Sequence, residues 1–312
     1  MPEAVQIVVS TFPNAKALPL WIAQKQGFFS ARGLDVLVNE TENSKLQREG
    51  LERGAIHIVQ AAVDNALSMI MSGLDVVIVM GGEGGMNDFI VQADIRAFKD
   101  LQARVLVVDS PDTAYALLAR KMLAQHGLTY NVDYTFKPVG NAGRRLKAMI
   151  DDPMIAGAVL NPPFSAEAQL RGMRSLGRLV DHLGPYQAGG AFVMRAWAHE
   201  NRQTLESYLG AYVEALRWLA DKRNAPAVEE MLCQRLNLSS EIAAATRREL
   251  NEPDFGFATD AKLDLVGLAN VLKTREETEG QDARLQDVNS FVDQSYYDNA
   301  MAIISTAMQK AN

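Results

Sequence analysis

From Pro19 to Val36 the chain reads PLWIAQKQGFFSARGLDV. The first part has apolar residues at helical spacing, and Gly27 follows where a helix would end in the left-handed conformation. The two phenylalanines after Gly27 are expected to fold back onto the core. Gly33 is expected to turn the chain into a strand that begins at Leu34. The stretch therefore predicts a helix, a glycine stop and a buried aromatic step before a strand.

Around this stretch, short β-branched runs alternate with helical patterns, which is typical of parallel βαβ units. The first block has expected strands at Val5–Ser10, Leu34–Val38, Ile56–Gln60 and Asp75–Met80, with helices at Leu18–Gln26, Ser44–Arg53 and Asn65–Ser72. After the glycine-rich residues 81–85 and a strand at Phe89–Val91, the second block has strands at Arg104–Val108, Tyr134–Val139, Ile155–Leu160 and Leu176–Val180, with helices at Asp112–His126, Arg144–Asp151 and Phe164–Arg171.

From Ala196 onward the strand signal stops and helical patterns dominate, at Ala196–Asp221, Ala225–Leu236, Ser239–Leu250, Thr259–Lys273 and Phe291–Gln309. The expected fold is α/β with two lobes, each a mostly parallel sheet flanked by helices. Residues 1–90 with 186–312 would form the first lobe, including the C-terminal helices, and residues 91–185 the second, with a ligand cleft between them. The polar segment Thr274–Asp287 is expected to be a solvated loop or helix face.

Composition excludes several classes of partner. The 312 residues contain 31 Lys and Arg against 38 Asp and Glu, a net charge of −7, and no basic block. This balance argues against binding to nucleic acid or to an anionic membrane surface. No run of about 20 apolar residues is present, so no membrane span is expected. The single cysteine, Cys233, cannot form an internal disulfide or a two-cysteine metal site.

Two facing sets of strand ends point to a ligand site. In open α/β sheets, ligands bind beyond the carboxyl ends of the strands, where helix N-termini present spare N–H groups. The loops at these ends combine small residues, which let a ligand approach the backbone, with polar side chains. The candidate ligand-binding residues are Thr11, Phe12, Asn14, Leu18, Gln60, Ala61, Asn65, Gly82, Glu83, Ser110, Asp112, Thr113, Asn141, Arg144 and Asn161.

Several of these side chains also have a structural interpretation. Ser110 and Asp112, like Asp64, are well placed to cap the helices that follow them. Phe12 is either a stacking wall for a flat ligand or a core contact. Both interpretations stay open for each residue.

Charge at the loop tips has both signs. Arg144 and Arg145 begin an expected helix, where one guanidinium could hold a sulfonate or carboxylate in a bidentate manner or else remain solvated. Glu83 and Asp112 are acidic and would suit a cationic or amino-bearing ligand. The sequence therefore leaves the charge of the solute open.

Several motifs resemble the solute-binding proteins of the nitrate, sulfonate and taurine class of ABC transporters, the SsuA/TauA and NMT1/THI5-like proteins. The resemblance rests on Gly27-Phe28-Phe29 followed by Gly33-Leu34-Asp35-Val36. Leu51–Ile58 resembles the next sequence motif of these proteins, with His57 in place of the usual aspartate. Phe98–Leu101 resembles the entry to the second lobe, although the residues that follow depart from it, and Gly157–Pro163 resembles a later strand and loop.

This resemblance implies a periplasmic binding protein fold of type II. It implies a protein that captures a small organic ligand, a sulfonate, a carboxylate or an aromatic or heteroaromatic acid, between its lobes for uptake through an ABC permease. No bond would be made or broken, and no cofactor or metal would be needed. Whether the protein is a monomer or a dimer stays open.

The alternative is a cytoplasmic enzyme of the same fold. The first strand begins almost at Met1, which leaves no room for a secretory signal. Either the protein is cytoplasmic, or the sequence starts at a mature, periplasmic N-terminus with an added Met. A decarboxylase-like, lyase or thiamin-pyrimidine-like enzyme would act on a small aromatic or heterocyclic acid. Its general acid or base would come from Glu83, Asp64, Asp112 or His57.

Motifs for other chemistries are absent from the sequence. It contains no G-x-x-x-x-G-K-[ST] phosphate-binding loop and no G-x-S-x-G nucleophile elbow. The four histidines, His57, His126, His182 and His199, have no metal-ligand spacing. Cys233 lies in a strongly helical stretch rather than at a loop tip, which weighs against the cysteine nucleophile of the desulfinases that share this fold. A third alternative, a ligand-sensing domain that regulates a partner, has no identifiable interaction surface.

Overall fold

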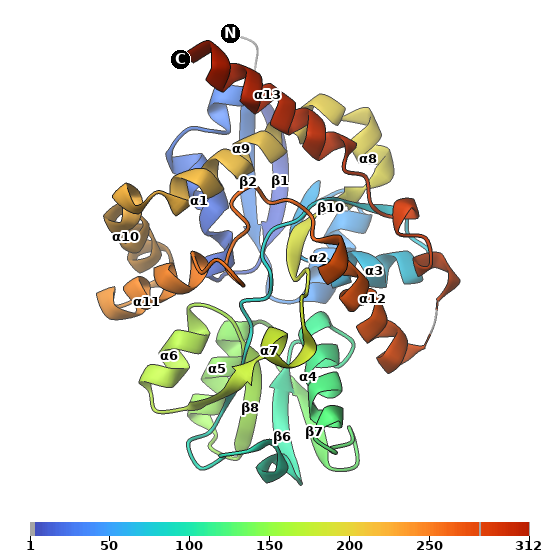
Figure 1. Cartoon of the computed structure of the whole chain (residues 1–312), viewed down its shortest axis with the longest axis vertical. Helices are drawn as coiled ribbons and strands as arrows, with labels where there is room; N and C mark the ends of the chain where they lie inside the picture. The colour runs from blue at the N-terminus through green and yellow to red at the C-terminus, as the bar shows by residue number, and fades with distance from the viewer. Residues whose placement is uncertain (1–3, 281, 312) are drawn as a thin grey trace.

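The computed structural model describes residues 4–280 and 282–311 and contains two five-stranded sheets, each flanked by helices (Figure 1). The first sheet has the order β2-β1-β3-β10-β4 and consists of β1 (Val5–Thr11), β2 (Leu34–Glu40), β3 (Ile58–Ala62), β4 (Val76–Met80) and β10 (Gly189–Met194). The second has the order β7-β6-β8-β5-β9 and consists of β5 (Asp88–Val91), β6 (Arg104–Val108), β7 (Tyr134–Pro138), β8 (Ile155–Leu160) and β9 (Arg174–Arg178).

Both sheets follow one plan. In the first, β1 pairs in parallel with β2 and β3, while β10 runs antiparallel between β3 and β4. In the second, β6 pairs in parallel with β7 and β8, while β5 runs antiparallel between β8 and β9. The antiparallel strand of each sheet is the one that the chain contributes as it crosses between lobes. We propose lobe boundaries within residues 81–87 and 179–188.

The segment after Leu18 folds as its sequence predicts. Helix α1 (Leu18–Lys25) is followed by Gly27 at φ +75°, and the amide of Phe28 donates to the carbonyl of Ala23 at 2.9 Å. The ring of Phe29 is buried and stacks on Tyr208 with centroids 5.7 Å apart. Gly33, at φ +69°, then leads directly into β2. The left-handed glycines thus direct the aromatic step into the core.

Helices cover the faces of both sheets. Those of the first lobe are α1, α2 (Ser44–Glu52), α3 (Asp64–Met71), α8 (Arg195–Glu200), α9 (Arg202–Ala220), α10 (Ala225–Leu236) and α13 (Ser295–Ala311). Those of the second are α4 (Ala114–Gln125), α5 (Ala142–Asp151), α6 (Phe164–Leu170) and α7 (Leu179–Leu183). Two more helices, α11 (Ser240–Leu250) and α12 (Leu265–Glu279), also reach the second lobe, where they contact α6 and α4. The C-terminal region therefore bridges the lobes as well as completing the first one.

Two expected elements differ in their limits, and one strand was not expected. The strand expected at Leu176–Val180 ends at Arg178, where α7 begins. The helix expected at Ala196–Asp221 is interrupted at Asn201, which separates α8 from α9. Strand β10 was not expected, because its first two residues are glycines, which have low strand propensity. A Cβ on the second of them, Gly190, would lie 2.6 Å from the carbonyl oxygen of Met80, so the close packing of β10 against β4 requires glycine.

The C-terminal polar segment is the main correction. Helix α12 begins at Leu265 rather than at Thr259 and continues to Glu279, so the first part of the polar segment lies on a helix, which was one of the two expected alternatives. Thr274 and Arg275 are buried, and Arg275 forms an ion pair with Asp64 at 2.6 Å. The charge of this stretch therefore holds α12 against the first lobe. No helix within residues 4–280 and 282–311 is long and apolar enough to cross a membrane.

Candidate functional site

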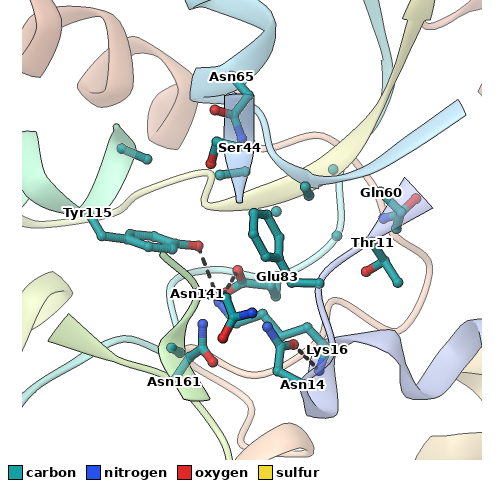
Figure 2. Close-up of a pocket in the computed structure, with 18 of the residues that line it drawn as sticks. Thr11, Asn14, Lys16, Ser44, Gln60, Asn65, Glu83, Tyr115, Asn141 and Asn161 are labelled. Carbon is teal, nitrogen blue, oxygen red and sulfur yellow. Dashed lines mark hydrogen bonds and ion pairs between the residues drawn. The ribbon is translucent and has the colours of Figure 1, made fainter. Parts of the chain in front are cut away.

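A cavity lies between the lobes at the carboxyl ends of the parallel strands. Its lining atoms enclose about 740 Å³, open solvent at its mouth included. Figure 2 shows polar side chains from both lobes converging on this space. The lining residues are Thr11, Phe12, Asn14, Lys16, Ser44, Gln60, Ala61, Ala62, Asn65, Gly82, Glu83, Asp109, Thr113, Ala114, Tyr115, Asn141, Ala142, Arg145, Asn161, Gly189, Gly190, Tyr212 and Phe257.

Most of the residues nominated from the sequence meet at this cavity. They are Thr11, Phe12, Asn14, Gln60, Ala61, Asn65, Gly82, Glu83, Thr113, Asn141 and Asn161. Leu18 does not line it, because this first residue of α1 is fully buried in the core of the first lobe. Ser110, Asp112 and Arg144 line an adjoining groove instead.

The groove residues are held by contacts outside the cavity. Arg144 is half exposed and pairs with Glu42 of the first lobe at 2.8 Å. The Ser110 hydroxyl donates to Asp112, whose other carboxylate oxygen lies 3.9 Å from Arg48. Thr113, rather than Ser110 or Asp112, is the N-terminal cap residue of α4. The capping expected of Ser110 and Asp112 is therefore not seen, and both contact neighbouring side chains instead.

The cavity also contains residues that were not expected there from the sequence, among them Lys16, Asp109, Tyr115, Tyr212 and Phe257, and of the two arginines considered as anion ligands it contains Arg145 rather than Arg144. Asp109 stands directly between the end of a strand and the expected ligand residue Ser110, so its place at a strand end is the signal that could have identified it. Tyr212 lies in the middle of α9 and Phe257 follows α11, where no local pattern marks a ligand site. Only the tertiary fold brings these rings to the cleft.

Lys16, which is largely buried, and Glu83, which is fully buried, form an ion pair with an Nζ to Oε1 distance of 2.6 Å. The ammonium also donates to Asn87 at 3.3 Å and to the Tyr115 hydroxyl at 3.4 Å. Burial alone would lower the pKa of Lys16, but the charge and hydrogen bond of Glu83 outweigh it and raise that pKa above its ordinary value. With these three partners, the three N–H donors of Lys16 are occupied within the protein.

Glu83 is equally committed to the fold. Its second carboxylate oxygen accepts hydrogen bonds from the backbone amides of Gly85 at 2.7 Å and Met86 at 3.0 Å. The acidic side chain expected to suit a cationic ligand is thus neutralised by Lys16 and anchors the segment between β4 and β5. It leaves no free negative charge at this wall of the cavity.

Arg145 has the opposite character. Its side chain is buried, with 5 % of the residue exposed, yet its guanidinium donates no hydrogen bond to any described residue, and its Nε is fully enclosed. Burial lowers the pKa of Arg145, against the opposing charge of Asp109, although an arginine stays protonated in proteins. A buried cation without hydrogen-bond partners is costly. Arg145 is therefore the positive group that the cavity leaves free for a ligand.

The amide side chains of the cavity are partly used by the fold. The Oδ1 atom of Asn141 accepts from the amide of Arg144 at 3.1 Å, so Asn141 caps α5. Asn65 accepts from Arg48 at 3.1 Å, and Gln60 accepts from the Tyr208 hydroxyl at 3.3 Å. Asn161 is buried and its Oδ1 has no partner among the described residues. Structural and ligand-facing roles are thus combined in the same loops.

Two of the acid and base candidates of the enzyme alternative lie in other surroundings, and so does the single cysteine, whereas Glu83 lines the cavity. Cys233 sits on α10 against the core of the first lobe. His57 precedes β3, where its Nδ1 accepts from the amide of Val8 at 2.9 Å and its ring stacks on Trp197. Asp64 is paired with Arg275. None of the three lines the cavity.

Comparison with known proteins identifies the family and the fold. The model of the NMT1-like family matches residues 1–233. No protein of curated function matches by sequence. Three solved structures share the fold over nearly their whole length. A protein of Bordetella bronchiseptica RB50 is 21% identical, with a TM-score of 0.82, 97% of this chain and 98% of that chain being covered.

The periplasmic nitrate-binding protein NrtA from Synechocystis PCC 6803 is 15% identical, with a TM-score of 0.80, and 97% and 89% of the two chains are covered. The alkanesulfonate-binding protein SsuA from Xanthomonas axonopodis pv. citri, bound to MOPS, is 18% identical, with a TM-score of 0.75, and 94% and 99% are covered. The expected two-lobed periplasmic binding protein fold is thereby confirmed.

Proposed function

Because the chain belongs to the NMT1-like family, we propose that it is a solute-binding protein of an ABC import system. It would hold a small organic acid, a sulfonate, a carboxylate or an aromatic or heteroaromatic acid, between its two lobes and present it to a permease. The residues that line the cavity would bind the solute. Such import places the working protein in the periplasm, outside the membrane that contains the permease.

The free guanidinium of Arg145 carries this proposal. The other cation of the cavity, Lys16, is occupied by Glu83, Asn87 and Tyr115, whereas Arg145 has no hydrogen-bonded partner. A carboxylate or sulfonate would supply the missing hydrogen-bond acceptors. The two named relatives, a nitrate-binding and an alkanesulfonate-binding protein, are also described by anionic ligands.

Four aromatic rings line the cavity and would contact the part of the solute that does not carry the acid group. Phe12 comes from the first lobe, Tyr115 from α4, Tyr212 from α9 and Phe257 from the segment after α11. Rings and small residues around a few polar groups are typical of sites for small organic molecules. The cavity would thus accept an apolar or aromatic body behind the acid group.

Closure of the lobes would couple binding to transport. Contacts already cross the cleft: the amide of Ala15 donates to the carbonyl of Pro162 at 3.2 Å, and Arg178 lies 3.6 Å from the centre of the Phe255 ring. A solute that touches both lobes would favour this closed arrangement over an open one. The closed form would be the one that the permease recognises.

Thermal shift and calorimetry with a solute panel test the proposal. The panel contains sulfonates, carboxylates, aromatic acids, pyrimidines and polyamines. A ligand at a thousand times its Kd stabilises the native state by about 4 kcal/mol. We expect acids to bind the native protein, and Arg145→Met to abolish that binding. Arg144→Met is the matched control, because Arg144 lies in the groove and pairs with Glu42. Binding of a neutral or cationic solute that is unaffected by Arg145→Met would contradict the proposal.

A further inference from the structure

Asp109 and Arg145 lie at neighbouring strand ends of the second lobe and both line the cavity. Asp109 directly follows β6, and Arg145 lies in the first turns of α5, which follows β7. Strands β6 and β7 are parallel neighbours, so their carboxyl ends share one edge of the sheet. A cation and an anion thus stand at the same wall of the cleft: the charge of Asp109 acts on Arg145, but Oδ1 of the one and Nε of the other have no hydrogen-bond partner among the described residues.

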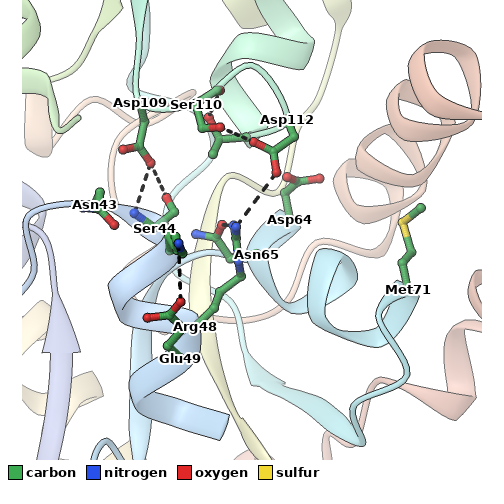
Figure 3. A network of polar contacts seen from close by, with 12 residues as sticks. Asn43, Ser44, Arg48, Glu49, Asp64, Asn65, Met71, Asp109, Ser110 and Asp112 are labelled. Atoms are coloured by element: carbon green, nitrogen blue, oxygen red, sulfur yellow. Dashed lines mark hydrogen bonds and ion pairs between the residues drawn. The ribbon is translucent and has the colours of Figure 1, made fainter. Parts of the chain in front are cut away.

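The carboxylate of Asp109 is held from one side only. Its Oδ2 accepts from the hydroxyl of Ser44 at 2.5 Å and from the backbone amide of Ser44 at 3.2 Å. Figure 3 shows this carboxylate above the N-terminus of α2, which belongs to the first lobe. Its Oδ1 is enclosed and has no partner among the described residues. Asp109 is therefore fixed in place with one acceptor oxygen unused.

Charge balance then restricts the ligand. Lys16 and Glu83 cancel each other, which leaves one free cation, Arg145, and one half-satisfied anion, Asp109. A simple anion on Arg145 would place two negative groups side by side in a poorly solvated site. A solute that also carries a cationic hydrogen-bond donor would satisfy both residues and bring no net charge into the cavity.

We propose that the solute is an acid that also bears an amino group, with its acid group on Arg145 and its ammonium on Oδ1 of Asp109. This inference rests on the proposed function and narrows it. Arg145 selects the acid, and Asp109 selects among acids for the amino-bearing one. The hydroxyl of a hydroxy acid would satisfy the same oxygen through a weaker, uncharged donor.

Matched pairs of solutes test the inference: butanoate with 4-aminobutanoate, propanoate with alanine, and ethanesulfonate with 2-aminoethanesulfonate. Calorimetry measures the affinity ratio within each pair. We expect the amino member of at least one pair to bind about tenfold more tightly or better. In Asp109→Asn this preference should disappear, while the parent acid should bind no worse than before, because the neighbouring negative charge is gone.

Ser44→Ala separates recognition from lobe closure. If Asp109 served only to join the lobes through Ser44, both variants would weaken the two members of a pair by the same factor. That result, or the absence of any preference in the unaltered protein, would overturn this inference and leave the proposed function standing. If no acid binds, with or without an amino group, the proposed function fails and this inference fails with it.

Discussion

The ammonium of Lys16 and the carboxylate of Glu83, 67 positions apart in the chain, meet at 2.6 Å at the wall of the cleft. Lys16 belongs to the short 3-10 helix Ala15–Ala17 of the first lobe, and Glu83 to the segment that crosses to the second. The same ammonium also donates a hydrogen bond to the hydroxyl of Tyr115, which lies on α4. One buried lysine thus joins both lobes and the crossing segment.

Removing this lysine should destabilise the fold. Lys16→Met leaves the Glu83 carboxylate, whose side chain is 2 % exposed, without its counter-charge. We expect the free energy of unfolding to fall by about 3 kcal/mol, as measured by urea denaturation. Lys147→Met is the control, because Lys147 is largely exposed in its pair with Asp151 and should contribute little. Equal effects of the two substitutions would show that the buried pair is not structural.

Removing the free cation should have the opposite effect on the ligand-free protein. Arg145→Met replaces a buried guanidinium that lacks hydrogen-bond partners with an apolar side chain of similar length. We expect the ligand-free variant to be more stable by about 1 kcal/mol, since the cost of burying a charged group without hydrogen bonds is removed. Chemical denaturation in ligand-free buffer measures the free energy of unfolding of the variant and of the unaltered protein. A large loss of stability would mean that Arg145 supports the fold.

Stability should also depend on pH through Glu249. Burial and the nearby charge of Asp88 raise the pKa of this carboxyl to about 7, from an ordinary value of 4.5. The folded chain therefore keeps the proton to higher pH than the unfolded chain does. The associated stabilisation is complete below about pH 4.5 and is lost as the pH rises through about 7. Burial raises the pKa of Asp88 as well, which acts in the same direction.

Glu249→Gln isolates this contribution. The variant should match the unaltered protein near pH 4.5 and exceed its free energy of unfolding by up to about 3 kcal/mol at pH 8. Glu241→Gln, an exposed change on the same helix, is the control and should show no such trend. A difference between Glu249→Gln and the unaltered protein that shrinks as the pH rises would contradict the assignment.

The glycine that precedes β2 offers a test of backbone strain alone. Gly33 has φ +69°, and a Cβ there would meet no atom within 4 Å. Gly33→Ala should therefore cost about 1 kcal/mol through conformation rather than through a clash. Gly33→Asn should recover part of this loss, because asparagine tolerates the left-handed region better. Thermal unfolding of the two variants compares them, and equal losses would indicate that another effect dominates.

Much of the fold could be predicted from local sequence patterns. Strand alternation placed the parallel strands of both sheets, and Gly27 and Gly33 marked two turns that the structure contains. Strand β10 was missed because the double glycine at its start has a meaning only when β3 and β4 lie on either side of it. Arg275 was assigned to a solvated segment because its partner, Asp64, is 211 positions away.

The position of the cavity could be predicted from the sequence, but the charges available to a ligand within it could not. Strand ends identified Asn14, Gln60 and Asn161, since their place follows from the topology of parallel strands. The charge state of the site did not follow from the sequence. Lys16 and Arg145 are both basic residues near strand ends, and only their surroundings show that one is paired and the other is free.

The position of β10 in the chain also determines which lobe can fold first during translation. This strand completes the first sheet by entering between β3 and β4, yet its residues, 189–194, leave the ribosome more than one hundred positions after β4. All strands of the second sheet, residues 88–178, emerge in that interval. The inserted lobe can therefore fold while its host is still an open sheet with a missing strand, and the host cannot be complete before residues 189–194 and the helices that follow them have been translated.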